Sequence, residues 1–168
     1  YEYVSDPDYA ESLKYLKSEK NILVLRTFSK IFGLAGLRLG YGIAKKETIS
    51  DMNRIREPFN ANTLAQKAAV EALKDTEHLR ISRDINEKGK EYLYDKLNLI
   101  GIKYIPTEAN FIYMVLDLDS KLMYNKLLEK GIIVRTVGPR EVRVTIGLPE
   151  ENRRFIEALK TVIEELSH

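Results

Sequence analysis

The stretch of sequence that decides the fold reads RTFSKIFGLAGLRLGY and spans residues 26–41. The apolar run NILVLRT (residues 21–27) leads into it and has the length of a strand. Because the run is apolar on both alternations, it predicts a strand that is covered on both faces, as in an α/β sheet. Glycines at positions 33, 36 and 40 then punctuate the chain before a second short strand, predicted over residues 41–44.

Lys30 lies just after the first predicted strand, where turn residues are usual. In open α/β sheets, active sites lie at the carboxyl edges of the strands. The hydroxyls of Thr27 and Ser29 and the guanidinium of Arg38 flank this lysine, and together they could hold a phosphate. A lysine beside a phosphate site suggests an aldehyde cofactor that carries a phosphate, because a partly deprotonated amine forms a Schiff base.

A structural role for this lysine stays open at this point. The same Ser-Lys dipeptide occurs at Ser120–Lys121, at the start of a predicted surface helix. The glycines form neither a P-loop nor a GxGxxG motif, so nucleotide binding is not supported.

The rest of the chain predicts helices first and then a mixed rhythm of strands and helices. Asn60 is expected to cap the second helix, and Gly101 and Gly131 are expected to end helices. The predicted helices span residues 46–56, 62–74, 76–99, 121–130 and 149–166, and the later strands span residues 102–105, 110–116, 132–135 and 141–146. The last third therefore predicts a β–β–α–β–β–α domain with helices over one sheet face.

Composition narrows the class of protein. The chain has 168 residues, of which 44% are hydrophobic, and a net charge of +2, so we expect a globular protein and neither nucleic acid nor a membrane as its partner. The absence of Cys excludes disulfides and thiolate metal sites. His78 and His168 are too few and too far apart for a histidine metal site, so no metal is expected. No signal peptide or membrane span is recognisable, and a cytoplasmic protein is expected. The start at Tyr1 suggests a piece of a longer protein.

The string TFSKIFGLAGLRLGY (residues 27–41) closely resembles the cofactor-lysine signature of fold-type I, pyridoxal-phosphate-dependent aminotransferases. From Tyr1 to about Leu166, the chain resembles the C-terminal half of the histidinol-phosphate aminotransferase family. Further matching pieces are residues 56–60, 109–112, 131–135 and 142–147. The resemblance implies an α/β fold: residues 1–60 would be the remnant of the large cofactor-binding domain, residues 61–99 connecting helices, and residues 100–168 a small α+β domain.

The resemblance also implies roles for single residues. Lys30 would form the Schiff base with pyridoxal 5'-phosphate and then move protons as general base and acid. Thr27, Ser29 and Arg38 would hold the cofactor phosphate. Arg143 would receive the anionic group of the substrate and Arg135 would be a second anion contact.

For Arg143 and Asn110, a purely structural role is the alternative to substrate binding. We expect Val142 and Val144 to point away from the face that carries Arg143, although a plain surface arginine is the alternative. One guanidinium binds either a carboxylate or a phosphate bidentately, so this site would suit glutamate and histidinol phosphate alike. Asn110 matches a substrate-side position and is expected to begin a strand, with a strand-end turn residue as the alternative.

The activity implied by the resemblance is transamination between histidinol phosphate and 2-oxoglutarate or glutamate, in histidine biosynthesis, by a homodimer that acts on small molecules. The groups that tune the cofactor ring would lie upstream of Tyr1, so this chain alone is expected to be inactive. Another class I aminotransferase or a threonine-phosphate decarboxylase would share the same motifs. A non-enzymatic α+β interaction module, with a structural Lys30, is the remaining alternative.

Overall fold

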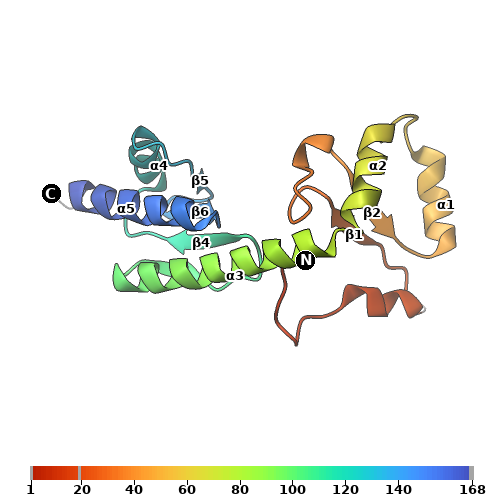
Figure 1. Ribbon diagram of the computed structural model, residues 1–168, viewed down its shortest axis with the longest axis horizontal. Helices are drawn as coiled ribbons and strands as arrows, with labels where there is room; N and C mark the ends of the chain where they lie inside the picture. The colour runs from red at the N-terminus through yellow and green to blue at the C-terminus, as the bar shows by residue number, and fades with distance from the viewer. Residues whose placement is uncertain (1, 19, 167–168) are drawn as a thin grey trace. The chain divides into compact units, whose positions relative to one another are not determined.

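The computed structural model describes residues 2–18 and 20–166, so Tyr1 and His168 lie outside the described residues. The chain divides into two compact units, Tyr1–Ile81 and Ser82–His168 (Figure 1). The division falls within the long helix α3 (Thr76–Leu99). The division into three parts at residues 60 and 99 remains a prediction, since compact units are not the domains of a whole protein.

The first unit is built around a short antiparallel hairpin. Its strands β1 (Val24–Thr27) and β2 (Gly40–Ile43) pair with Thr27 opposite Gly40. A Cβ atom at Gly40 would lie 2.7 Å from the Arg26 carbonyl oxygen, so this close approach requires glycine. The other elements of the unit are the 3₁₀ helices η1 (Ser12–Lys17) and η2 (Ala35–Leu37), the helices α1 (Lys46–Ile55) and α2 (Thr63–Ala72), and the start of α3.

A small apolar core fixes the turn that follows β1. Phe28, Ile31 and Phe32 are buried in it together with Ala69 of α2. The ring centroids of Phe28 and Phe32 lie 5.0 Å apart, a distance typical of favourable aromatic pairs. Because the apolar side chains of the sequence FSKIF point into this core, Ser29 is left half-buried and Lys30 exposed.

The prediction of a strand covered on both faces is wrong. The strand begins at Val24 rather than at residue 21, and Leu25 on its second face is 61% exposed. Within the described residues, β1 pairs only with β2. A strand with one neighbour, and with no layer over one of its faces, leaves half of its apolar side chains in solvent.

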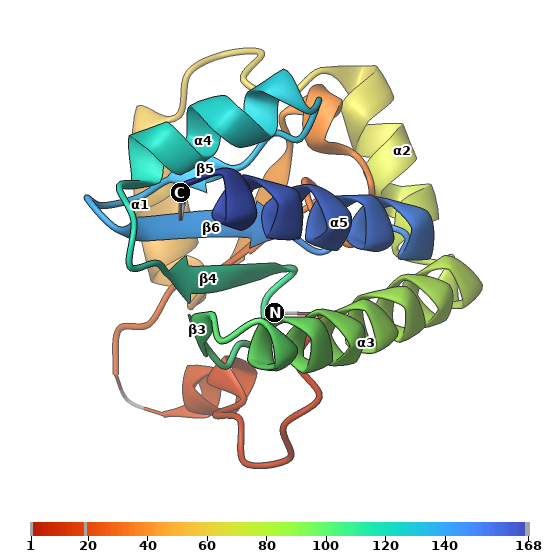
Figure 2. The same cartoon turned by 90° about the vertical axis from the view of Figure 1, so that its left-hand side faces the viewer.

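The second unit confirms the predicted β–β–α–β–β–α order. Its antiparallel sheet has the strand order β3-β4-β6-β5, formed by β3 (Lys103–Ile105), β4 (Phe111–Val115), β5 (Arg135–Thr136) and β6 (Glu141–Thr145). The helices α4 (Ser120–Glu129) and α5 (Pro149–Leu166) lie along the sheet (Figure 2). Side chains of α3, α4, α5 and alternate strand residues form one core, so helices cover one sheet face as expected.

Two helices end at a glycine in the same way, which also corrects one predicted strand. After α4, Gly131 (φ +73°) donates its N–H to the Leu128 carbonyl and Ile132 donates to that of Leu127, which is a Schellman motif. Because this motif uses the Ile132 amide, the strand predicted from residue 132 begins only at Arg135. Gly101 and Ile102 end α3 with the equivalent pair of hydrogen bonds.

The cap of α2 differs from the prediction by two residues. The side chain of Asn62, and not that of Asn60, accepts a hydrogen bond from the Ala65 N–H, at 2.8 Å. Asn62 stands directly before Thr63, within reach of the free amides of the first turn, whereas Asn60 stands two residues farther away. Among the described residues, no helix combines the length and the apolarity that a membrane crossing requires.

Candidate functional site

An open cavity of about 790 Å³ in the first unit brings together three of the predicted cofactor-binding residues. Thr27 at the end of β1, Ser29 in the following turn and Arg38 before β2 all line it. The hairpin register explains this arrangement, since it places the carboxyl end of β1 beside the start of β2. Helix α1 contributes further lining residues, among them Ile49, Met52 and Asn53.

The two hydroxyl residues are linked by a local hydrogen bond. The Ser29 N–H donates to Thr27 Oγ1 at 3.0 Å, a local turn that threonine and serine favour. Because Thr27 Oγ1 acts here as an acceptor, its own proton can still be donated to another group. Both hydroxyls thus remain potential donors to an anion in the cavity.

Arg38 has a backbone conformation that is unusual for its residue type. Its φ of 53° and ψ of 46° place it in the left-handed region, which costs a non-glycine residue about 1–2 kcal/mol. One of its side-chain nitrogens, Nη1, donates to the Ala35 carbonyl at 2.7 Å. The remaining guanidinium N–H groups can face an anion, and backbone strain of this kind is typical of functional sites.

Lys30 follows Ser29 directly and is exposed, although it is not among the lining residues of the cavity. The Lys30 carbonyl accepts a hydrogen bond from the Gly33 N–H at 2.8 Å, and the Phe28 carbonyl accepts one from the Leu34 N–H at 3.0 Å. These bonds close a tight turn around the lysine. Across the described ranges, Lys30 has no ion-pair partner, so no carboxylate competes for its amine.

The sequence interpretation gave no site role to several polar residues that line this cavity. Tyr41, Arg56 and Asn60 also line it. Tyr41 was given no role, and residues 56–60 served only as part of the resemblance. The sequence held one indication of their position, because Pro58 stops the preceding helix and so predicts a turn at residues 56–60. In that turn Phe59 has a φ of 61° and is 99% exposed.

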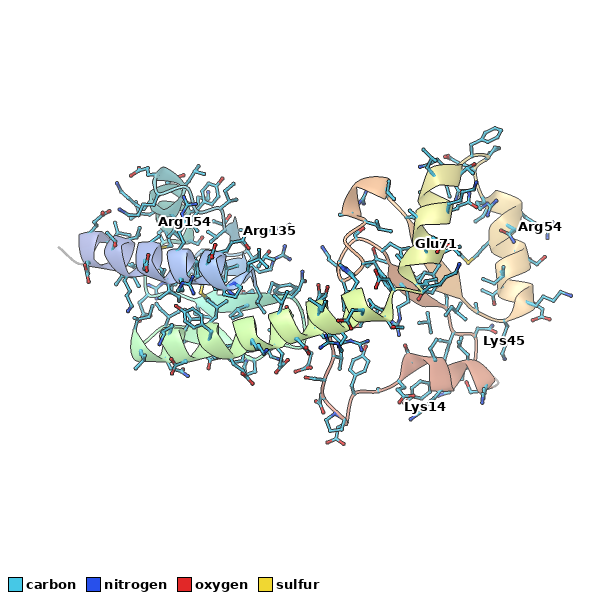
Figure 3. All side chains as sticks on the ribbon, in the orientation of Figure 1. Lys14, Lys45, Arg54, Glu71, Arg135 and Arg154 are labelled. Carbon is cyan, nitrogen blue, oxygen red and sulfur yellow. The ribbon has the colours of Figure 1, made fainter. Side chains whose placement is uncertain are left out.

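The second unit places the two predicted anion-binding arginines opposite each other. Arg135 of β5 and Arg143 of β6 are register partners, so both lie on the same sheet face. Figure 3 labels Arg135 at the edge of this unit. Like charges directly opposite each other destabilise a sheet, and neither arginine has an ion-pair partner within residues 82–166. An uncompensated pair of cations is a natural site for an anion.

The surroundings of Arg143 agree with the expected alternation. Val142 and Val144 are buried in the core on the opposite face. On the open face, the guanidinium carbon of Arg143 lies 4.6 Å from the centre of the Phe111 ring, within the range of a cation–π contact. This contact holds the guanidinium over the sheet.

Asn110 lies one residue before β4, so the predicted strand starts one residue later than expected, at Phe111. Its carbonyl accepts the Ile146 N–H at 3.0 Å. Just before it, the Ala109 carbonyl accepts the Asn86 side-chain amide of α3 at 3.3 Å. Hydrogen bonds therefore join the backbone around Asn110 to Ile146, the residue after β6, and to helix α3.

A buried lysine anchors the same loop. Lys90 of α3 has a side chain that is only 7% exposed, with its Nζ atom 2.9 Å from Glu87 and 3.3 Å from Glu108. Burial alone would lower the pKa of Lys90, but the hydrogen bonds and charges of both carboxylates outweigh it and raise that pKa. In the adjacent turn of α3, the Tyr94 hydroxyl accepts the Thr107 N–H at 2.7 Å.

Comparison with known proteins agrees with this arrangement. A histidinol-phosphate aminotransferase of Moorella thermoacetica is 50% identical over 167 residues, which cover 96% of this chain and 43% of that protein. The crystal structure of the histidinol-phosphate aminotransferase from Clostridium acetobutylicum matches with a TM-score of 0.89 at 29% identity, covering 98% of this chain and 52% of that one. The enzyme from Sinorhizobium meliloti, solved in complex with pyridoxal-5'-phosphate, matches with a TM-score of 0.79 at 27% identity, covering 86% and 41%.

The chain spans less than half of the length of the Moorella protein and about half of the Clostridium chain. These matches confirm the resemblance inferred from the sequence and the α/β fold class. Residues 2–159 match the family model for aminotransferase class I and II. A match that extends over nearly the whole chain leads to one assignment: the chain belongs to the class I and II aminotransferases, enzymes that depend on pyridoxal phosphate.

Proposed function

We propose that this chain supplies the lysine-bearing part of an aminotransferase that moves an amino group between histidinol phosphate and 2-oxoglutarate or glutamate. The proposal includes a place in histidine biosynthesis, a cytoplasmic location and a homodimeric whole protein. The observation that carries it is the convergence of Thr27, Ser29 and Arg38 on one cavity, with Lys30 next to Ser29 in the chain. Similarity to named histidinol-phosphate aminotransferases supports the choice of substrate.

The donor set of the cavity fits the cofactor phosphate. Two hydroxyls and a guanidinium offer several N–H and O–H donors and one fixed positive charge, which is the chemistry that a phosphate dianion needs. When bound, pyridoxal phosphate supplies an aldehyde that captures amino groups and a ring that withdraws electrons. Thr27, Ser29 and Arg38 would hold its phosphate, so the cofactor would stay bound even when it is not linked to Lys30.

Lys30 has two tasks in this proposal. Its Nζ atom would hold the cofactor covalently when no substrate is bound, and it would also take and return the proton at the reacting carbon of the substrate. Among residues 2–18 and 20–166 no carboxylate pairs with Lys30, and its side chain is exposed, so its amine is accessible to a ligand.

Arg135 and Arg143 bind the anionic group of the substrate, with Asn110 as a further contact. Two opposed guanidiniums that lack acidic partners suit both a carboxylate and a phosphate. A single anion site of this kind serves both half-reactions, since histidinol phosphate has a phosphate and no carboxylate.

Covalent labelling tests the lysine. Pyridoxal phosphate is added to the chain, the sample is reduced with borohydride, and the added mass is located by peptide mapping, with Lys30→Ala as the control. Label confined to Lys30 is the expected result. Label spread over surface lysines and unchanged in the variant means that this chain alone forms no site, so the labelling is repeated on a version extended upstream of Tyr1. Failure there too would contradict the proposal.

A second measurement, on the extended version loaded with pyridoxal phosphate, tests the reaction. Histidinol phosphate is expected to change the cofactor absorbance to that of the amine form, and 2-oxoglutarate is expected to restore it. Release of carbon dioxide from threonine phosphate would instead assign a decarboxylase. No spectral change with any amino compound, together with unselective labelling, would favour a non-enzymatic module.

A further inference from the structure

His78 makes a long-range contact with the turn that carries Lys30. Its Nε2 atom lies 2.8 Å from the Ile31 carbonyl oxygen, although the two residues are 47 positions apart. A carbonyl can only accept, so the hydrogen must lie on Nε2 of the imidazole. Ile31 is the residue directly after Lys30, which puts this bond one peptide unit from the lysine.

Other contacts hold the start of α3 in the same place. The His78 N–H donates to Asp75 Oδ1 at 2.9 Å, which caps the first turn of the helix. The next residue, Leu79, packs against the core formed by Phe28, Ile31 and Phe32. The imidazole therefore reaches the turn from a helix that is itself anchored to that core.

Few other hydrogen bonds hold the backbone of the turn at residues 28–34. Its backbone is closed by the bonds from Gly33 to Lys30 and from Leu34 to Phe28. The Ile31 side chain is 2% exposed and fixes the apolar side. Among the described residues, the hydrogen bond that reaches the Ile31 carbonyl comes from His78, so loss of the imidazole would leave this carbonyl without that bond.

We propose that His78 is a positioning residue for Lys30: by holding the Ile31 carbonyl it fixes the backbone from which the lysine amine extends. The proposal rests on the proposed function only for the role of that amine. A lysine that must carry a cofactor and then return to it gains from a fixed backbone, because small misplacements of a reacting group slow its reaction strongly.

Three variants of the full chain test this role. His78→Gln keeps an N–H donor close to the position of Nε2, whereas His78→Leu removes the donor and keeps the bulk. Glu77→Gln is the matched control, since Glu77 occupies the same helical turn and pairs with Arg80 instead of the lysine turn. Hydrogen exchange measured by mass spectrometry on peptides covering residues 28–34 gives the first result. Peptides from β2 and α2, in the same unit, report whether each variant is folded.

The expected result is exchange about fivefold faster in His78→Leu over residues 28–34, the effect of one lost hydrogen bond. His78→Gln and Glu77→Gln are expected to match the unchanged protein. In the labelling experiment, the rate of borohydride-trapped labelling at Lys30 is expected to fall about tenfold in His78→Leu and to recover in His78→Gln.

The outcomes separate this inference from the proposed function. Unchanged exchange in His78→Leu overturns the inference, whatever the labelling shows. Faster exchange with a normal labelling rate at Lys30 also overturns it, because the turn would then move without affecting the amine. If Lys30 is labelled neither in the unchanged protein nor in the version extended upstream of Tyr1, the proposed function fails, and the exchange alone decides whether His78 fixes the turn.

Discussion

Arg38 combines a strained backbone with a side chain suited to phosphate. Its left-handed conformation would suit glycine better. We therefore predict that Arg38→Gly is more stable than Arg38→Ala by about 1 kcal/mol, because only glycine accepts this backbone without strain. Urea unfolding of the two variants measures the difference.

Both Arg38 variants are expected to bind pyridoxal phosphate more weakly than the unchanged protein, as measured by fluorescence titration, since each lacks the guanidinium. Equal binding by Arg38→Gly would remove this arginine from the phosphate site. Equal stability of the two variants would mean that the backbone at position 38 relaxes out of the left-handed region.

The facing arginines give a second prediction at the level of single residues. Arg135→Gln removes one of two like charges that lie directly opposite each other. We expect the free energy of unfolding in low salt to rise by about 0.5 kcal/mol, and the gain to shrink in high salt. Added inorganic phosphate should stabilise the unchanged protein but not the variant. Stabilisation of both to the same extent would argue against an anion site here.

At the scale of whole elements, glycine at helix ends sets the connections of the second unit. Gly101 has a φ of +73° and nothing within 4 Å of an added Cβ atom. Gly101→Ala is therefore expected to lower the free energy of unfolding by about 1 kcal/mol through backbone strain alone. Thermal or urea unfolding checks this value, and Leu99→Ala, an exposed change in the last turn of α3, is the control. A loss no larger than that of the control would mean that the Schellman motif adds little.

Helix α3 is joined to the loop before β4 by the buried Lys90 and its two carboxylates. Lys90→Met is expected to destabilise the chain at neutral pH by roughly 1–3 kcal/mol, because charged hydrogen bonds in a shielded position are lost.

The pH dependence of the Lys90 contribution follows from the direction of its shift. The folded-state pKa of Lys90 lies above its unfolded value, so the stabilisation is fully present below about pH 10.4 and is lost as the pH rises through the folded pKa. Unfolding measured from pH 7 to 11 should therefore bring the unchanged protein and the variant closer together at the alkaline end. A constant gap would show that the charge on Lys90 is not the cause.

Most helices and strands could be predicted from the sequence, because local signals define them. Apolar periodicity, with Gly101 as a stop signal, predicted a helix over residues 76–99, and α3 has these bounds. The failures arose where a tertiary contact competes with a local pattern. Ile132 looks like a strand residue, but its amide closes the preceding helix. Leu25 looks like a core residue, but its side chain is 61% exposed.

The candidate site was predictable only in part. Thr27, Ser29 and Arg38 lie within twelve residues of one another, so the motif already implied that they meet. Arg56 and Asn60, which follow α1 in the chain, line the same cavity as the hairpin residues, and this placement depends on tertiary structure that no local pattern encodes. The opposition of Arg135 and Arg143 depends on strand register, and the contact of His78 with Ile31 spans 47 residues.

At the scale of the whole molecule, the two units have unequal cores. The core of the second unit joins residues from α3, α4, α5 and the sheet, whereas that of the first unit holds Phe28, Ile31, Phe32 and Ala69. We predict that amides of β1 and β2 exchange hydrogen at least about tenfold faster than those of β4 and β6, since local stability follows buried apolar contacts. Exchange measured by mass spectrometry checks this. Equal protection would mean that the chain opens as one cooperative body.

The facing arginines also bear on how fast a ligand arrives. Two fixed cations on an open sheet face attract an anion from beyond contact distance, and such attraction speeds diffusional encounter by about tenfold or more in low salt. A doubly charged phosphate ester is drawn more strongly than a singly charged carboxylate, so two ligands that differ in this way would differ in association rate even where the same guanidiniums bound both. The order in which competing anions occupy this face in the cell would then depend on ionic strength as much as on fit.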